Sequence, residues 1–252
     1  MLALPILRRR RTHKFGAGQA LMLNTIILLI FFYLIFAYSI ILHEVFHGLA
    51  ALWLGDPTAK YAGRLTANPL KHIDPLMTVI IPLVMMFTVG IAIGGAKPVP
   101  YNPYNLRNQK WGPTIVALAG PGSNLAIAII FTIIGSLVSI PLAIKLDVIH
   151  NLISADWSAL TAVVSGSFGT IVYTLSVMAI FWNILIAVFN MIPFPPLDGS
   201  KLLFALISVK IETMAILEQY GFIFLFLFIF IFIGPLSLLL NFFWQFFFGL
   251  TL

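Results

Sequence analysis

Cysteine is absent from this chain of 252 residues, and charged side chains make up only 9% of it. The first absence excludes a disulfide scaffold and any thiolate metal site, so a metal ion would have to be bound by histidine and carboxylate side chains. The scarcity of charge, with 61% hydrophobic residues and a mean hydropathy of +1.06, excludes a soluble globular protein. The composition predicts a multi-pass integral protein, which we place in the cell membrane.

Long apolar runs organise the chain. A helix of about 20 residues crosses the hydrocarbon core of a bilayer. The runs therefore predict an all-α polytopic membrane protein with about four to six transmembrane helices, built as one domain over 1–252 with its catalytic core at about 21–207. They lie at 21–54, 76–94, 114–142, 160–192 and 220–250.

Three shorter features add detail to the predicted helices. Gly234-Pro235 interrupts the last run, so residues 220–250 predict either one kinked helix or a hairpin. The stretch 201–218 predicts a short amphipathic helix on the membrane surface. The more polar stretch 145–156 predicts a loop.

Basic residues outnumber acidic ones by 14 to 8, which gives a formal net charge of +6. Much of the excess lies in Arg8–Arg11 and Lys14, just before the first apolar run. Basic side chains at such positions meet lipid head groups and influence topology. The charge therefore predicts contact with the lipid bilayer, and no nucleic-acid partner is needed to explain it.

The first apolar run contains one group of ionisable residues, His43, Glu44 and His47. Ionisable groups at membrane depth are costly and mark functional sites. Positions i and i+4 of a helix share a face, so both imidazoles can reach one tetrahedral Zn²⁺. Glu44 beside them can take a proton from the attacking water, a role that commonly contributes about 10²–10⁴-fold to rate. This His-Glu-x-x-His pattern predicts a zinc hydrolase site inside the membrane.

A zinc ion held by two imidazoles needs at least one more protein ligand, with one position left open for water. Asp198 is a candidate because it follows Pro193, Pro195 and Pro196 at the mouth of an apolar run. These prolines prevent a regular helix, and irregular backbone at membrane depth is tolerated where protein or a cavity surrounds it. The alternative, an exit loop with a solvated Asp198, stays open at this point.

Five separated stretches of the chain form a recognisable set. They are His43-Glu44-x-x-His47, Asn68–Pro75, Gly95–Pro103, Gly120-Pro121-Gly122-Ser123-Asn124, and Asn190-x-x-Pro193-x-Pro195-x-Leu197-Asp198-Gly199. Their content and order resemble the site-2 proteases, the intramembrane zinc metalloproteases of peptidase family M50. The resemblance covers about 37–207, and it is to the compact prokaryotic branch without PDZ or CBS domains.

The resemblance implies that His43, His47 and Asp198 bind one Zn²⁺ per chain. It implies that Glu44 acts first as general base and then as general acid. His72 is left out of the metal site, because it lies in a polar segment and the other three ligands already leave an open coordination position.

Two asparagines are implied as helpers of the substrate. In the family the asparagine of the middle motif, here Asn124, lies near the metal, and the one heading the proline-rich motif, here Asn190, is associated with holding the substrate backbone. An unwound substrate exposes amide groups that need partners away from water. Hydrogen bonding between packed helices is the other reading of both residues.

Topology adds a further prediction, because His47 and Asp198 must meet at one depth. A full crossing by 76–94 would bring them in from opposite faces, so we predict a re-entrant membrane segment around 76–111. Family topology places the site near the cytoplasm. The basic cluster Arg8–Arg11 also favours the cytoplasm, which after a single span would place the His pair outside, so the orientation stays open.

These features predict a zinc metalloendopeptidase that acts on transmembrane helices of membrane-protein substrates, as in regulated intramembrane proteolysis. The substrate helix would enter laterally and unwind near the cut. One alternative is a membrane zinc carrier or sensor, and another is a catalytically inactive family member that acts as a binding partner. Glu44 separates them, because a carrier needs no carboxylate beside the first histidine. An iron-dependent oxidase would need more than the five histidines present. The oligomeric state is not predicted.

Overall fold

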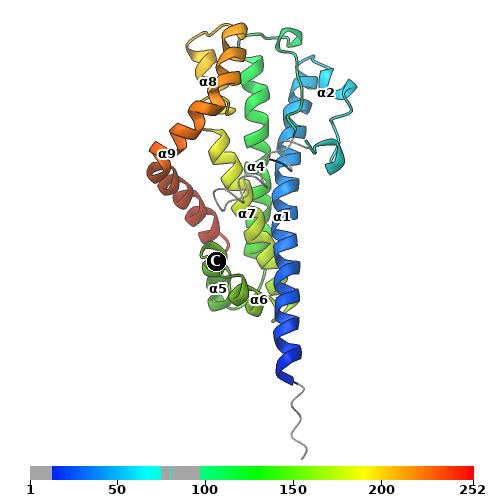
Figure 1. The fold of residues 1–252 in the computed structure, drawn as a ribbon, viewed down its shortest axis with the longest axis vertical. Helices are drawn as coiled ribbons and strands as arrows, with labels where there is room; N and C mark the ends of the chain where they lie inside the picture. The colour runs from blue at the N-terminus through cyan, green and yellow to red at the C-terminus, as the bar shows by residue number, and fades with distance from the viewer. Residues whose placement is uncertain (1–12, 75–79, 81–96) are drawn as a thin grey trace, which may run out of the picture.

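The structure, a computed structural model, describes residues 13–74, 80 and 97–252. Helices dominate, and these residues contain no strand. Four helices are long and apolar enough to cross a membrane, which confirms the predicted all-α polytopic fold. In chain order they are α1 (His13–Trp53), α4 (Gly112–Leu137), α7 (Phe168–Asn190) and α9 (Ile211–Gly249), shown in Figure 1.

Helix α7 lies at the centre of the bundle and contacts α1, α4 and α9. Its buried residues recur at helical spacing, as with Tyr173, Val177, Ile180 and Ile184. In the span of α9, by contrast, only 6% of the most apolar window is buried. An exposed apolar helix is stable in a bilayer because lipid chains are as apolar as its side chains. The packed core is therefore formed mainly by α1, α4 and α7, and most of the α9 span lies on the outside.

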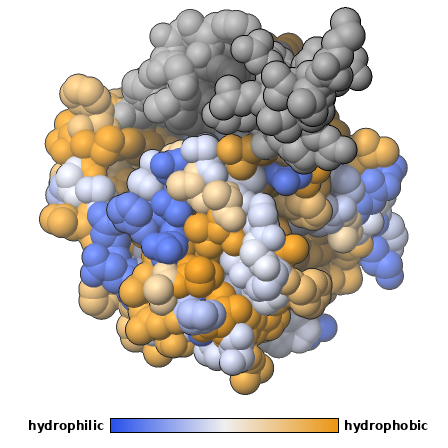
Figure 2. All heavy atoms as spheres, turned by 90° about the horizontal axis from the view of Figure 1, so that it is seen from below, coloured by the Kyte–Doolittle hydropathy of each residue, from blue (hydrophilic) through white to orange (hydrophobic). Residues whose placement is uncertain are grey.

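The end of the bundle opposite the His pair carries α5 (Leu142–Ile153) and α6 (Trp157–Val164). The prediction of a loop over 145–156 is wrong, because α5 covers most of it. Its buried residues Lys145, Val148 and Leu152 have helical spacing, and the polar residues between them face outward. Seen from this end, hydrophilic side chains gather to one side among apolar ones (Figure 2).

The segment after the proline-rich motif also differs from the prediction, because it is divided between two helices. Helix α8 (Gly199–Leu206) ends before Ser208, whose φ of 54° is left-handed and interrupts the helix, and α9 begins at Ile211. The single amphipathic helix predicted for 201–218 is therefore wrong. Helix α9 then continues through Pro235 to Gly249 and bends along its course, so the last apolar run is one helix and not a hairpin.

The chain leaves α1 and enters α4 at the same end of the bundle (Figure 1). The Arg107 amide donates to the Leu54 carbonyl at 2.9 Å, and the Lys97 amide donates to the His72 carbonyl at 2.8 Å. The segment between α1 and α4 therefore makes no net crossing. Most of the predicted re-entrant segment, 76–96, lies outside the described residues. Short helical turns in the connection are α2 (Thr58–Tyr61), η1 (Pro69–Lys71) and η3 (Pro103–Asn105).

Candidate metal centre and catalytic site

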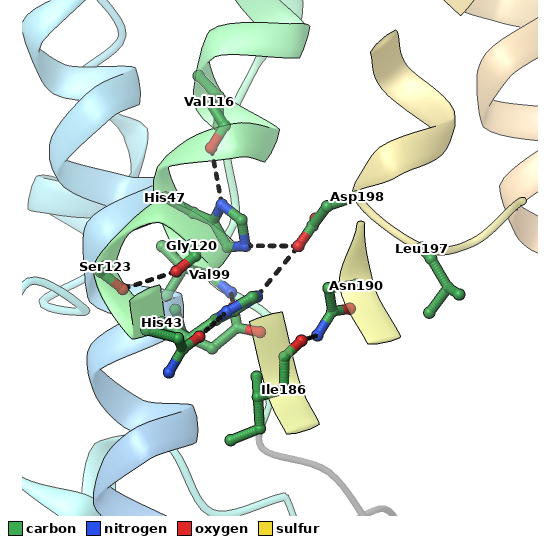
Figure 3. A network of polar contacts seen from close by, with 12 residues as sticks. His43, His47, Val99, Val116, Gly120, Ser123, Ile186, Asn190, Leu197 and Asp198 are labelled. Carbon is green, nitrogen blue, oxygen red and sulfur yellow. Dashed lines mark hydrogen bonds and ion pairs between the residues drawn. The ribbon is translucent and has the colours of Figure 1, made fainter. Parts of the chain in front are cut away.

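Three side chains from distant parts of the chain converge near one end of the bundle (Figure 3). Nε2 of His43 lies 3.1 Å from Oδ2 of Asp198, and Nε2 of His47 lies 3.3 Å from the same oxygen. One ligand atom from each residue lies within 4.8 Å of the others. The two histidines are one turn apart on α1, as their spacing predicts. The structure thus brings together the three residues predicted to bind metal.

The proline-rich segment between α7 and α8 delivers Asp198 to this point. The segment turns back sharply, so a Cβ added to Gly199 would lie only 2.6 Å from the Ile192 carbonyl oxygen. Only glycine fits such an approach of two backbone segments. Asp198 is half-buried, with 20% of its side chain exposed. It faces the histidines and is not a solvated loop residue.

Hydrogen bonds to the far side of each imidazole determine which nitrogen carries the proton. Nδ1 of His43 lies 2.6 Å from Oδ1 of Asn124, and Nδ1 of His47 lies 2.7 Å from the Val116 carbonyl oxygen. Both oxygens are acceptors only, so each Nδ1 holds the hydrogen and each Nε2 presents a lone pair. Both Nε2 atoms then face the same Asp198 oxygen, at distances where either a shared proton or a metal ion can lie between them. As metal ligands, two imidazole nitrogens and one carboxylate oxygen form a donor set that fits zinc.

Asn124 is fully buried and belongs to a polar network between α1, α4 and α7. Its Nδ2 donates to the Ser39 carbonyl at 3.1 Å and to Oδ1 of Asn183 at 2.8 Å. Asn183 in turn donates to the Ser39 hydroxyl at 2.9 Å. These bonds fix the amide of Asn124 so that its oxygen faces His43. Asn124 therefore lies next to one of the predicted metal ligands, and its predicted contact with substrate stays a prediction.

The Asn124 contact gives a testable prediction for zinc affinity. Asn124→Leu leaves the Nδ1 hydrogen of His43 without its acceptor, so we expect zinc affinity to fall about 10-fold to 100-fold. Competition with a zinc chelator measures this. Thr132→Val on the same helix is the control, because among the described residues the buried Thr132 hydroxyl bonds only to the Ala128 carbonyl. Equal zinc affinity in both variants would contradict the role of Asn124.

Gly120 makes the close approach of α4 to the histidines possible. A Cβ at this position would clash with the His47 imidazole and lie 2.7 Å from Nε2 of His43. We therefore expect Gly120→Ala to displace the imidazoles and lose most of the bound zinc, as measured by metal analysis of the purified protein. Gly122→Ala should retain zinc, because nothing lies within 4 Å of its Cβ. A Gly120→Ala protein with full zinc content would contradict this packing.

Glu44 follows His43 on α1 and is half-buried at the edge of the ligand group. Its Oε2 accepts a hydrogen bond of 2.8 Å from the Val99 backbone amide. The carboxylate is thus held by part of the Gly95–Pro103 stretch, one of the five motif stretches in the sequence.

Asn190 ends α7 and lies beside Asp198 (Figure 3). It is half-buried, and Nδ2 donates to the Ile186 carbonyl at 3.0 Å. Its predicted contact with substrate stays a prediction. His72 is buried away from this group, with Nε2 2.8 Å from the Thr66 carbonyl oxygen.

The comparisons with known proteins agree with this geometry. The chain matches peptidase family M50 over residues 31–231. It is 33% identical over 186 residues to "Putative zinc metalloprotease YwhC" of Bacillus subtilis, which covers 73% of each chain. It is 34% identical over 92 residues to "Putative zinc metalloprotease Rip2" of Mycolicibacterium smegmatis, covering 36% of this chain and 34% of the relative. Rip2 of Mycobacterium tuberculosis is 26% identical over 161 residues, covering 64% and 51%.

The matches to the two Rip2 proteins thus span only about a third and about half of those relatives. No solved structure gives a significant match to this chain. The family match is broad, since it contains α4 and α7 and every residue of the converging group. Four apolar helices long enough to span a bilayer agree with a membrane enzyme. The chain therefore belongs to peptidase family M50, the site-2 protease family of membrane zinc metalloproteases.

Proposed function

We propose that this protein is an intramembrane zinc endopeptidase that cuts membrane-protein substrates in or near their transmembrane helices. One observation carries the proposal. The predicted ligands His43 and His47 lie on α1 within Gly18–Trp53, a stretch long and apolar enough to cross a membrane. A reaction at this site takes place among spanning helices, so its substrate is a chain that reaches the same depth. The cell membrane is the proposed location.

The residues divide the chemistry between them. His43, His47 and Asp198 would hold one Zn²⁺ per chain and leave one coordination position open. When bound, zinc supplies a Lewis acid that polarises the scissile carbonyl and lowers the pKa of the attacking water. The Glu44 carboxylate accepts the proton of that water and later donates it to the leaving amine. The hydrogen bonds to Nδ1 of both imidazoles keep the Nε2 lone pairs aimed at the ion.

An apolar cavity of about 530 Å³ between α4, α7 and α9 supports access from the lipid phase. It is lined by Pro121 and Met191, which neighbour Gly120 and Asn190 in the chain, and by Leu239 and Phe243 of α9. Such a cavity accommodates the apolar side chains of a transmembrane segment, whereas a water-soluble peptide gains little from it. A peptide bond in an intact helix has its carbonyl hydrogen-bonded, so the substrate must unwind at the cut. In this proposal Asn190 bonds amide groups that unwinding exposes.

The proposal is tested with purified protein in liposomes and a panel of reporter proteins, each with one transmembrane helix. We expect cleavage of reporters with helix-weakening residues in the membrane, at a bond that mass spectrometry places within or next to the span. Short water-soluble peptides that contain only the sequence around the cut should be poor substrates. Cleavage only in soluble loops would contradict the intramembrane substrate. Zinc binding without cleavage of any reporter would favour a zinc carrier or an inactive binding partner.

A further inference from the structure

The carboxylate of Glu44 is held by a backbone segment 55 residues further along the chain. This segment, Lys97–Asn102, runs past α1 without regular secondary structure. The Val99 amide donates to Oε2 of Glu44 at 2.8 Å. Among the described residues, the other oxygen of Glu44, Oε1, makes no hydrogen bond. One carboxylate oxygen is therefore fixed, and the other remains for a proton.

The sequence of the 97–102 segment makes this contact specific. Pro98 and Pro100 flank Val99 and have no N–H, so Val99 supplies the only amide donor over these three positions. A proline also restricts the residue before it to an extended backbone, which here applies to Lys97 and Val99. The segment therefore presents one N–H with little conformational freedom.

A glycine on α1 lets the segment come this close. Gly48 lies one turn after Glu44 on the same face, and a Cβ there would lie 2.9 Å from Cγ1 of Val99 and 2.6 Å from Cδ2 of Leu65. The Val99 side chain is only 7% exposed. The contact with Glu44 is thus part of a packed interface, where a small shift of the segment is resisted.

Both ends of the segment are tied to buried charged residues. At the start, the Arg64 guanidinium donates to the Lys97 carbonyl. At the end, the Asn102 amide donates to Oδ2 of Asp56 at 2.7 Å. Arg64 and Asp56 are 6% and 0% exposed. Burial alone would raise the pKa of Asp56, but hydrogen bonds from Thr58 and from residues 102 and 105 hold this pKa below its usual range. Asp56 is therefore a carboxylate at neutral pH, and such charge-assisted bonds are strong.

We propose that the Val99 N–H positions the Glu44 carboxylate for catalysis, with Pro98, Pro100 and Gly48 fixing the segment that carries it. The hydrogen bond sets the rotation of the carboxylate, so that Oε1 faces the attacking water at the metal centre. Val99 is a positioning residue, because it acts through Glu44 and does not touch the substrate. This inference rests on the proposed function, in which Glu44 transfers the proton.

The test replaces the backbone N–H of Val99 by an oxygen atom, which cannot donate a hydrogen bond. Val99 is replaced by its α-hydroxy acid, which converts the amide between Pro98 and Val99 to an ester and keeps the side chain. Tyr101 is replaced in the same way as the matched control, because its amide makes no hydrogen bond among the described residues. Turnover of a reporter that the parent protein cuts, KM, bound zinc and thermal stability are measured for all three proteins.

We expect the ester at Val99 to lower kcat about 10-fold to 100-fold, the range for a misplaced catalytic group, with KM and zinc content unchanged. The ester at Tyr101 should keep the kcat of the parent. Equal kcat for both esters would overturn the positioning role, and so would a loss of zinc or stability that matches the loss of turnover. In both cases the proposed protease function would stand, because the parent still cuts. Failure of the parent to cut any reporter would instead remove the proposed function and this inference with it.

Discussion

Replacing Glu44 by glutamine is expected to reduce peptide cleavage by at least about 10²-fold and to leave bound zinc unchanged. Glutamine keeps the size of the side chain, and its amide oxygen still accepts the hydrogen bond from Val99. It cannot take a proton from water at neutral pH. The three predicted metal ligands are untouched by the change. Turnover and zinc content, measured on the same preparation, test both parts of this expectation.

Glu212→Gln is the matched control for this variant. Glu212 lies on the exposed start of α9, where it accepts a hydrogen bond of 2.6 Å from the Tyr104 hydroxyl, and it is not one of the residues that converge on the metal centre. This control should cleave at the parental rate. A Glu44→Gln protein that cuts normally would show that the proton is transferred by another group. Loss of zinc together with activity would mean that Glu44 also supports the metal centre.

The second large effect is expected from Asp198→Asn, which should lower zinc affinity by more than about 100-fold. Losing a residue that only supports a ligand costs at most about that much, and Asp198 is itself a predicted ligand. An amide oxygen is a much weaker zinc ligand than a carboxylate, and the neutral side chain no longer balances the charge of the ion. Chelator competition gives the affinity, and activity should fall in proportion to the zinc lost.

Asp147→Asn serves as the control for Asp198→Asn. Asp147 is exposed on α5, at the opposite end of the bundle. Its substitution should change neither zinc affinity nor turnover. Parental zinc affinity in Asp198→Asn would contradict a three-residue metal centre and would require another ligand.

The metal-binding residues could be predicted from the sequence because their signals are local. The spacing of His43 and His47 depends only on helical geometry, and the three prolines before Asp198 exclude a regular helix. The contacts that support these residues could not be predicted in the same way. Asn124 bonds to His43 across 81 positions of sequence, and Val99 bonds to Glu44 across 55. Such contacts depend on how segments far apart in the sequence pack together. The helical periodicity of the sequence does not reveal that packing.

The fold was predictable to a similar degree and for similar reasons. Apolar runs of sufficient length predict spanning helices, because the bilayer requires internally bonded backbone over its full thickness. The errors fell outside the membrane spans, where composition is mixed. Polar side chains on the outer face of α5 made a helix resemble a loop. At Ser208 a left-handed backbone conformation interrupts what composition alone predicts as one amphipathic helix.

A zinc titration of activity is the most direct test that the histidine and aspartate group is the catalytic centre. The purified protein is stripped of metal with a chelator, zinc is returned in known amounts, and cleavage of a transmembrane reporter is followed at each step. We predict no cleavage without metal and a linear recovery that stops at one zinc per chain. Full cleavage by metal-free protein, or recovery that needs two or more ions per chain, would contradict a single zinc centre at His43, His47 and Asp198.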